Sequence, residues 1–115
     1  MKRTLTILLS FLLLFSILPF ASAEDLKGPA AISYYTDQLD NEEIDGYEAI
    51  GTLYREGLNG ISRDYQLAIE WYQKGIDAGK VPSITAMGYM YFRGFGIVRD
   101  YDKAYDLFQQ AADRY

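Results

Sequence analysis

The carboxylates carry the most obvious chemistry in this sequence, because its 115 residues include no histidine and no cysteine. Without imidazole and thiol groups, the chain cannot build a Cys/His metal site, a disulfide, a cysteine nucleophile or a triad with a histidine base. The G-x-S-x-G and S-x-x-K motifs of serine nucleophiles are also missing. The sequence therefore predicts a protein that is not an enzyme and uses no cofactor and no metal ion.

Five carboxylates cluster in a short acidic run in the first half of the chain. Two of them could in principle act as a general acid and a general base. The spacing differs from the Asp-x-Asp-x-Asp-Gly start of a calcium-binding loop. We therefore interpret the run as a solvated linker with charges at a helix N-terminus, where the helix dipole favours them. The run consists of Asp37, Asp40, Glu42, Glu43 and Asp45.

The charge of the chain restricts its partners. Lys2 and Arg3 are the only charged residues before position 24, so residues 24–115 carry 16 acidic and 11 − 2 = 9 basic side chains, a formal charge of 9 − 16 = −7. A surface of this sign repels phosphate backbones and anionic lipid headgroups. We expect no nucleic-acid binding and no stable membrane insertion of the mature protein, and the charge favours a basic protein partner.

The first 23 residues have the layout of a secretory signal peptide. A basic start precedes an apolar stretch at residues 5–18, a helix breaker at Pro19 and the small triplet A-S-A at residues 21–23. This A-x-A triplet predicts cleavage after Ala23 and a periplasmic or secreted mature protein. The alternative is a retained anchor, because the uncharged run is just long enough to cross the hydrocarbon core of a membrane.

A repeat of 36 to 37 residues occupies the rest of the chain. The segment I-G-T-L-Y-R-E-G at residues 50–57 aligns with M-G-Y-M-Y-F-R-G at 87–94, and G-I-S-R-D-Y at 60–65 aligns with G-I-V-R-D-Y at 96–101. A fainter copy begins with A-I-S-Y-Y at residues 31–35. A period of this length indicates a solenoid, here half a repeat followed by two full ones.

These residues resemble the Sel-one-like repeat, a relative of the tetratricopeptide repeat. The resemblance rests on the L-G-x-L-Y-like first helix, the glycine-rich turn, the R-D before the second helix and the W-Y at residues 71–72. It implies an all-α, short α/α solenoid of about two and a half antiparallel helix-pair repeats. Gly46, Gly75 and Ser83 stand where the family usually has Ala, and Pro82 falls inside the usual opening of a helix. These departures predict lower local helix stability.

The apolar periodicity supports paired helices independently of the resemblance. At 100° per residue, the apolar residues of each first helix fall on one face. Gly51 and Gly88 lie in these faces, where glycine costs about 1 kcal/mol of helix propensity relative to Ala. We expect the compensation to come from close approach of the second helix at Ala68 and Ala104.

Capping residues give the helix boundaries. Asp64 and Asp100 are expected to be N-caps of the second helices, and Gly79 a C-terminal cap. The predicted helices lie near 29–39, 45–57, 64–78, 82–93 and 100–114, stacked as a right-handed antiparallel array. The aromatic residues predicted to lie in the core are Tyr34, Tyr35, Trp71 and Tyr72. The predicted organisation is a signal peptide (1–23), a half-repeat helix with the acidic linker (24–44), a first repeat (45–80) and a second repeat (81–115).

The resemblance also implies a binding surface. In tetratricopeptide-like stacks the first helices line the concave face, and the positions three before the repeat glycine and one, four and five after it point into it. Tyr and Arg are favoured anchors at such interfaces. The alternative is a solvated face on which Tyr89 and Phe92 merely cover the helix junction. The predicted stripe consists of Glu48, Thr52, Arg55, Glu56, Thr85, Tyr89, Phe92 and Arg93.

Three functions follow from these observations. The first is an exported, non-catalytic protein-binding module, in the form of a periplasmic immunity or regulatory protein that binds an envelope protein or peptide, as some relatives of this repeat class do. The second is a hydrolase of cell-wall-related β-lactams, a function linked to some secreted, cysteine-rich relatives of this repeat class. The cysteine pairs of those relatives are missing here. The third is a structural half-array that forms a homodimer through an open C-terminal end around Leu107, Phe108 and Tyr115.

The A-x-A triplet yields a direct prediction about export. Protein recovered from the cell envelope should have the mass of a chain that begins at Glu24, because signal peptidase cleaves after such a triplet. Intact-mass spectrometry measures this. A full-length mass in the membrane fraction would contradict cleavage and indicate a retained anchor.

Overall fold

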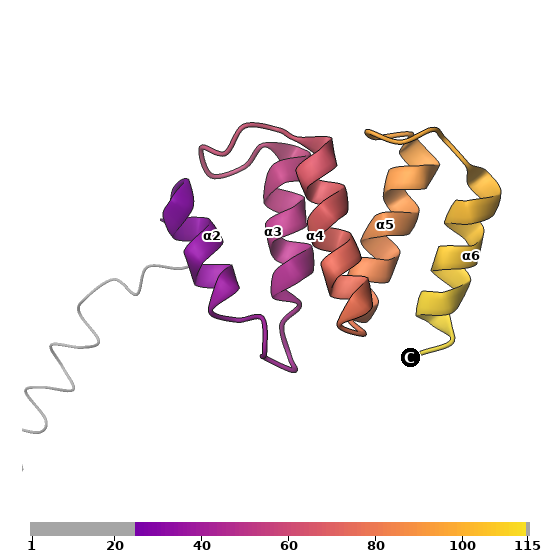
Figure 1. The fold of residues 1–115 in the computed structure, drawn as a ribbon, viewed down its shortest axis with the longest axis horizontal. Coiled ribbons are helices and arrows are strands. Elements are labelled where there is room, and N and C mark those ends of the chain that lie inside the picture. Colours follow the sequence, from indigo (N-terminus) through magenta and orange to yellow (C-terminus); the bar gives the residue numbers. More distant parts are fainter. Residues whose placement is uncertain (1–24, 115) are drawn as a thin grey trace, which may run out of the picture.

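Five α-helices and no strand make up residues 25–114, the part of the chain that the computed structural model describes. The signal-peptide interpretation of residues 1–23 lies outside these described residues. The helices run antiparallel, side by side in chain order (Figure 1). The prediction of an all-α fold is confirmed, and the predicted helices agree with the observed ones to within a few residues. The observed bounds are α2 Pro29–Thr36, α3 Gly46–Glu56, α4 Tyr65–Asp77, α5 Val81–Arg93 and α6 Tyr101–Ala112.

Two types of helix alternate along the array. The second helices of the repeats are α2, α4 and α6, whose equivalent residues Ala31, Ala68 and Ala104 are all buried. The first helices are α3 and α5, and each lies between two second helices; α3 also contacts α5 directly. None of the described helices is both long and apolar enough to cross a membrane.

Aspartate caps and left-handed glycines delimit the helices. Asp64 and Asp100 accept hydrogen bonds from the amides three residues later, at 3.0 Å and 2.9 Å, so both predicted N-caps are confirmed. Gly79 ends α4 as predicted: it follows the C-cap residue Ala78, and its amide donates to the carbonyl of Ile76 at 2.9 Å. Gly79 has φ +77°, a conformation that glycine adopts most readily, and the Lys80 amide then donates to a carbonyl of the last turn.

The helix glycines make room for aromatic rings, which corrects the expectation that they face alanines. A Cβ atom at Gly51 would run into the ring of Tyr72, and one at Gly88 would lie 2.7 Å from the ring of Phe108. Each ring lies one turn beyond the alanine that we expected at the contact. A ring is far bulkier than a methyl group, so only a residue without a side chain can face it at this helix separation.

The predicted aromatic core is confirmed for one residue and wrong for another. Tyr72 is fully buried, whereas Tyr34 is 37% exposed. Tyr35 and Trp71 are half-buried. The difference arises because α2 packs against α3 alone among the described helices. Within residues 25–114 no first helix covers its other side.

Asp45 connects two successive repeats. Its Oδ1 accepts a hydrogen bond from the Glu48 amide at 3.0 Å and so caps α3. Its Oδ2 accepts from the amide and the hydroxyl of Ser83, at 3.0 Å and 2.6 Å, and so caps α5. Lys80, the N-cap residue of α5, makes no capping side-chain hydrogen bond. One carboxylate of the acidic run therefore caps two helices and does not belong to a solvated linker.

The residues that depart from the repeat pattern pack closely against their neighbours near this cap. Ser83 is fully buried, and a Cβ atom at Gly75 would run into its hydroxyl. A Cβ atom at Gly46 would lie 2.6 Å from the carbonyl oxygen of Tyr35. Pro82 occupies the first turn of α5, where a backbone amide has no partner within the helix. The small residues thus compensate for their low helix propensity by allowing close contact.

Replacing Asp45 with Ala should cost about 2–4 kcal/mol in the free energy of unfolding, because it removes two caps and leaves the buried Ser83 hydroxyl without an acceptor. Asp64→Ala is the matched control: it removes a cap from one helix at an exposed site and should cost about 1 kcal/mol. Urea denaturation followed by circular dichroism measures both. Equal losses would contradict the two-helix role of Asp45.

Candidate functional site

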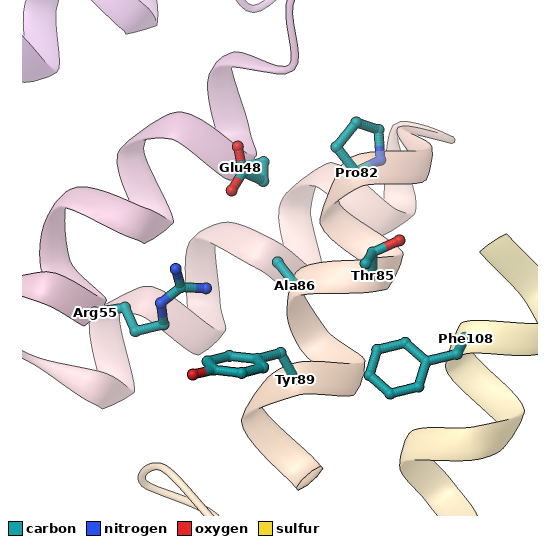
Figure 2. Close-up of a pocket in the computed structure, with 7 residues that line it drawn as sticks. All are labelled: Glu48, Arg55, Pro82, Thr85, Ala86, Tyr89 and Phe108. Carbon is teal, nitrogen blue, oxygen red and sulfur yellow. The ribbon is translucent and has the colours of Figure 1, made fainter. Parts of the chain in front are cut away.

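A groove with a volume of about 510 Å³ lies between α3, α5 and α6. Figure 2 shows the residues around it: Arg55 and Tyr89 point toward each other, and Phe108 approaches from α6. All three helices contribute, so the groove exists only when both repeats are folded. Its lining consists of Glu48, Arg55, Pro82, Thr85, Ala86, Tyr89 and Phe108.

Helical spacing places these side chains on common faces. Glu48 and Arg55 lie seven residues apart on α3, about two turns, and therefore on the same side. The four lining residues of α5 occupy positions 82, 85, 86 and 89, which is the i, i+3, i+4, i+7 pattern of one helix face. Phe108 reaches the groove because its ring passes over Gly88.

A hydrogen-bonded chain orients the acidic end of the groove. The Thr52 hydroxyl donates to Oε1 of Glu48 at 2.6 Å. Its oxygen lies 3.0 Å from the hydroxyl of Tyr72. Because Thr52 spends its only proton on Glu48, Tyr72 is the donor of the second bond. A carboxylate can accept about four hydrogen bonds, so Glu48 keeps acceptor capacity for a ligand.

A cluster of cations and rings forms the other end. The guanidinium carbon of Arg55 lies 5.0 Å from the centre of the Tyr89 ring, and that of Arg93 lies 5.8 Å from it. Arg55 also donates through Nε to Glu56 at 2.8 Å. Phe95 packs edge-on against Tyr89 with 5.9 Å between ring centres. These contacts hold Tyr89 in place from several sides.

Two groups at the groove have perturbed pKa values. Burial is the main cause that raises the pKa of Tyr72, with smaller contributions from the charges of Glu48 and Glu56; together they outweigh the hydrogen bond with Thr52 and the charge of Arg55, which lower it. Burial alone would lower the pKa of Arg55, but the electrostatic effect of Tyr72, the hydrogen bond and charge of Glu56 and the charge of Glu48 outweigh it and raise the pKa. Near neutral pH Tyr72 is therefore protonated and Arg55 is charged.

This arrangement suits binding. Glu48 is the one carboxylate among the lining residues, and general acid–base catalysis with two carboxylates needs a pair. Within residues 25–114 no group of three or more Asp, Glu, His or Cys side chains is arranged to hold a metal ion. The groove offers a carboxylate, a guanidinium group and an apolar floor, which can accommodate a peptide segment with mixed side chains.

The structure brings most of the predicted stripe together. Glu48, Arg55, Thr85 and Tyr89 line the groove. Thr52, Glu56 and Arg93 contact these lining residues through the hydrogen bonds, ion pair and ring contacts described above. Phe92 lies apart from them: its ring packs against Tyr101 of α6 with 5.4 Å between centres.

Three lining residues were missed from the sequence. Pro82 and Ala86 continue the face of Thr85 and Tyr89 at helical spacing, a signal that counting from the repeat glycine overlooks. Phe108 belongs to a second helix, and only the packing over Gly88 brings it to the groove.

The predicted open C-terminal end needs one correction. Leu107 is buried in the core at 7% exposure, because it faces the cluster that includes Met87 and Ala111. Phe108 is 37% exposed. Tyr115 lies outside the described residues.

Comparisons with known proteins agree with this architecture. The sequence model of the Sel1 repeat matches residues 44–80 and 81–115. A crystal structure of a Sel1 repeat protein from Oxalobacter formigenes is similar with a TM-score of 0.66 and 32% sequence identity, over 84% of this chain and 72% of that one.

Two curated proteins of Arabidopsis thaliana are also similar. The ERAD-associated E3 ubiquitin-protein ligase component HRD3B is 35% identical over 65 residues, 56% of this chain and 10% of the relative. The related component HRD3A is 40% identical over 47 residues, 41% of this chain and 7% of the relative. The chain therefore spans a tenth or less of the length of these relatives.

Tyr72→Phe tests the hydrogen-bonded chain beneath the groove. At neutral pH it should cost about 1 kcal/mol, because Thr52 loses one hydrogen bond and keeps the other. The raised pKa of Tyr72 means that its contribution is fully present below the unfolded-state value of about 10 and is lost as pH rises through the folded-state value. Between the unfolded-state and the folded-state pKa, the unfolding free energy of the wild type should therefore fall more steeply with pH than that of Tyr72→Phe. Urea titrations across this range measure both slopes, and equal slopes would contradict a buried, hydrogen-bonded hydroxyl.

Proposed function

Because the chain belongs to the Sel1 repeat family, we propose that it is an exported binding module that holds a segment of another protein in the groove between α3, α5 and α6. Sel1 repeat proteins are protein-interaction modules, and the family is typically a non-catalytic scaffold. The proposal adds the site and the compartment. The fold by itself does not specify either of them.

The observation that carries the proposal is the composition of the groove. Tyr89, Phe108 and Pro82 give it an apolar and aromatic lining, and Arg55 stands at its edge. Aromatic and arginine side chains are enriched among the residues that dominate binding energy at interfaces. Tyr89 is held by its neighbours before a ligand arrives, which reduces the entropy lost on binding.

The charges of the groove indicate the chemistry of the bound segment. Arg55 is engaged by Glu56 and Tyr89, whereas Glu48 retains acceptor capacity. A lysine or arginine of the partner would fit beside Glu48, with an apolar side chain on the floor next to it. The formal charge of residues 24–115, 9 − 16 = −7, favours a basic partner as well.

The N-terminal sequence supports the proposed compartment. The signal-peptide layout of residues 1–23 supports export, and we propose that the mature protein acts in the bacterial envelope as an immunity or regulatory protein. In that role it would bind and restrain an envelope protein without altering it chemically.

Blocking the groove tests the binding site. Thr85 is exposed and lines the groove, so Thr85→Trp should fill it while changing stability by about 0.5 kcal/mol or less. A partner captured from envelope extract by the wild type and identified by mass spectrometry should bind this variant about tenfold or more weakly in calorimetry. Binding to the wild type should also weaken with added salt.

Thr36→Trp is the matched control, because it makes the same replacement at an exposed position of α2. It should bind the partner like the wild type. If Thr85→Trp folds, as its circular dichroism and melting temperature would show, and still binds with unchanged affinity, the groove is not the site.

A further inference from the structure

We propose that the outer face of α6 is a second docking surface, next to the groove and sharing only Phe108 with its lining, and that it takes an amphipathic helix of another protein that ends in an aromatic–glycine turn. This face carries an apolar depression with a volume of about 290 Å³. Its aromatic residues are largely open to solvent: Tyr101 is 58% exposed, Tyr105 66% and Phe92 47%. The depression is lined by Phe92, Tyr101, Ala104, Tyr105 and Phe108.

The same face one repeat earlier is covered, which gives an internal control. Tyr72 of α4 is the equivalent of Phe108; it is fully buried, whereas Phe108 is 37% exposed. Tyr65 and Ile69 are half-buried, and they are the equivalents of the exposed Tyr101 and Tyr105. The surface of α6 therefore repeats a packing face whose counterpart is occupied in this molecule.

The elements that pack on this face of α4 show what such a face accepts. They are α5 and the turn that follows it. Phe95 stacks on Tyr65 with 4.8 Å between ring centres and 4° between planes. A Cβ atom at Gly96 would lie 2.6 Å from the Cβ of Tyr65, so the residue after the aromatic ring must be glycine. The Gly96 carbonyl accepts a hydrogen bond from Gln66 at 2.6 Å.

A second copy of the chain is not suited to this position. The cover must be a first helix, and both first helices of the described chain, α3 and α5, already lie between two second helices. A second copy would have to open one of its own repeats to supply one. Neither first helix within residues 25–114 is therefore free to cover this face, which suits the proposed helix of a different protein.

Two equivalent positions carry different residues in the two repeats, and these differences set the specificity of the face. Asp102 stands at the position of Gln66, and a carboxylate accepts hydrogen bonds but cannot donate to a turn carbonyl. The partner turn must therefore present a donor there, such as lysine or arginine. Phe92 stands at the position of Arg55, which lies over Tyr89 of the next helix. The partner should therefore carry an apolar side chain at the position that Tyr89 occupies in α5.

The experiment uses a labelled peptide with the sequence of residues 80–99, which is α5 with its turn, and measures fluorescence anisotropy with the purified protein. The peptide carries Gly88→Ala, because Ala is the better helix former and Phe108 is not beside it in this complex. Asp102→Gln restores the donor for the turn carbonyl. We expect this variant to bind the peptide about tenfold more tightly than the wild type.

Matched variants locate the binding. Adding Tyr105→Glu to Asp102→Gln, or Phe95→Ala to the peptide, should each weaken binding about tenfold. Adding Thr85→Trp, which blocks the groove, should leave it unchanged, so failure of this proposal is distinguishable from failure of the proposed function. The proposal is overturned if Asp102→Gln does not bind the peptide, if Tyr105→Glu has no effect, or if Thr85→Trp abolishes binding. It is also overturned if sedimentation shows a dimer of the wild type that Tyr105→Glu dissociates.

Discussion

The missing side chains of Gly51 and Gly88 set the geometry on which both proposed binding surfaces depend. Each glycine lets an aromatic ring of the following second helix cross the first helix at close range. The ring of Tyr72 thereby carries its hydroxyl to Thr52 at the groove. The ring of Phe108 reaches the groove on one side and the outer face of α6 on the other. A larger residue at either position would separate the helices and remove the contacts that arrange the site.

The features that were predictable from the sequence are those fixed by local rules. Helix periodicity gave the five helices, and the aspartates before the second helices were recognised as caps because capping depends on a few adjacent residues. Contacts between distant residues were not accessible in the same way. The partners of the helix glycines were misassigned by one turn, and the link from Asp45 to Ser83 carries no local signal. Of the groove-lining residues, the predicted stripe included the four at positions 48, 55, 85 and 89, and helical spacing would also have given Pro82 and Ala86, whereas Phe108 depended on packing.

The two repeats share their architecture but differ in their surfaces. Arg55 of the first repeat corresponds to Phe92 of the second, and Gln66 corresponds to Asp102. The first member of each pair is used inside the array, to hold Tyr89 and the turn after α5. The second member lies at the surface of α6 or close to it. Since the core positions are kept and these positions change, binding specificity can vary between repeats at little cost to folding.

The bond between Asp45 and Ser83 has a consequence for the cooperativity of the array. It joins residues 38 positions apart and connects α3 to α5 across α4. In a solenoid with contacts between neighbours alone, the terminal units can open independently. Here the opening of α5 also removes a partner from the cap of α3, so the two repeats are coupled. Amide hydrogens of α3, α4 and α5 should therefore exchange through one shared opening event.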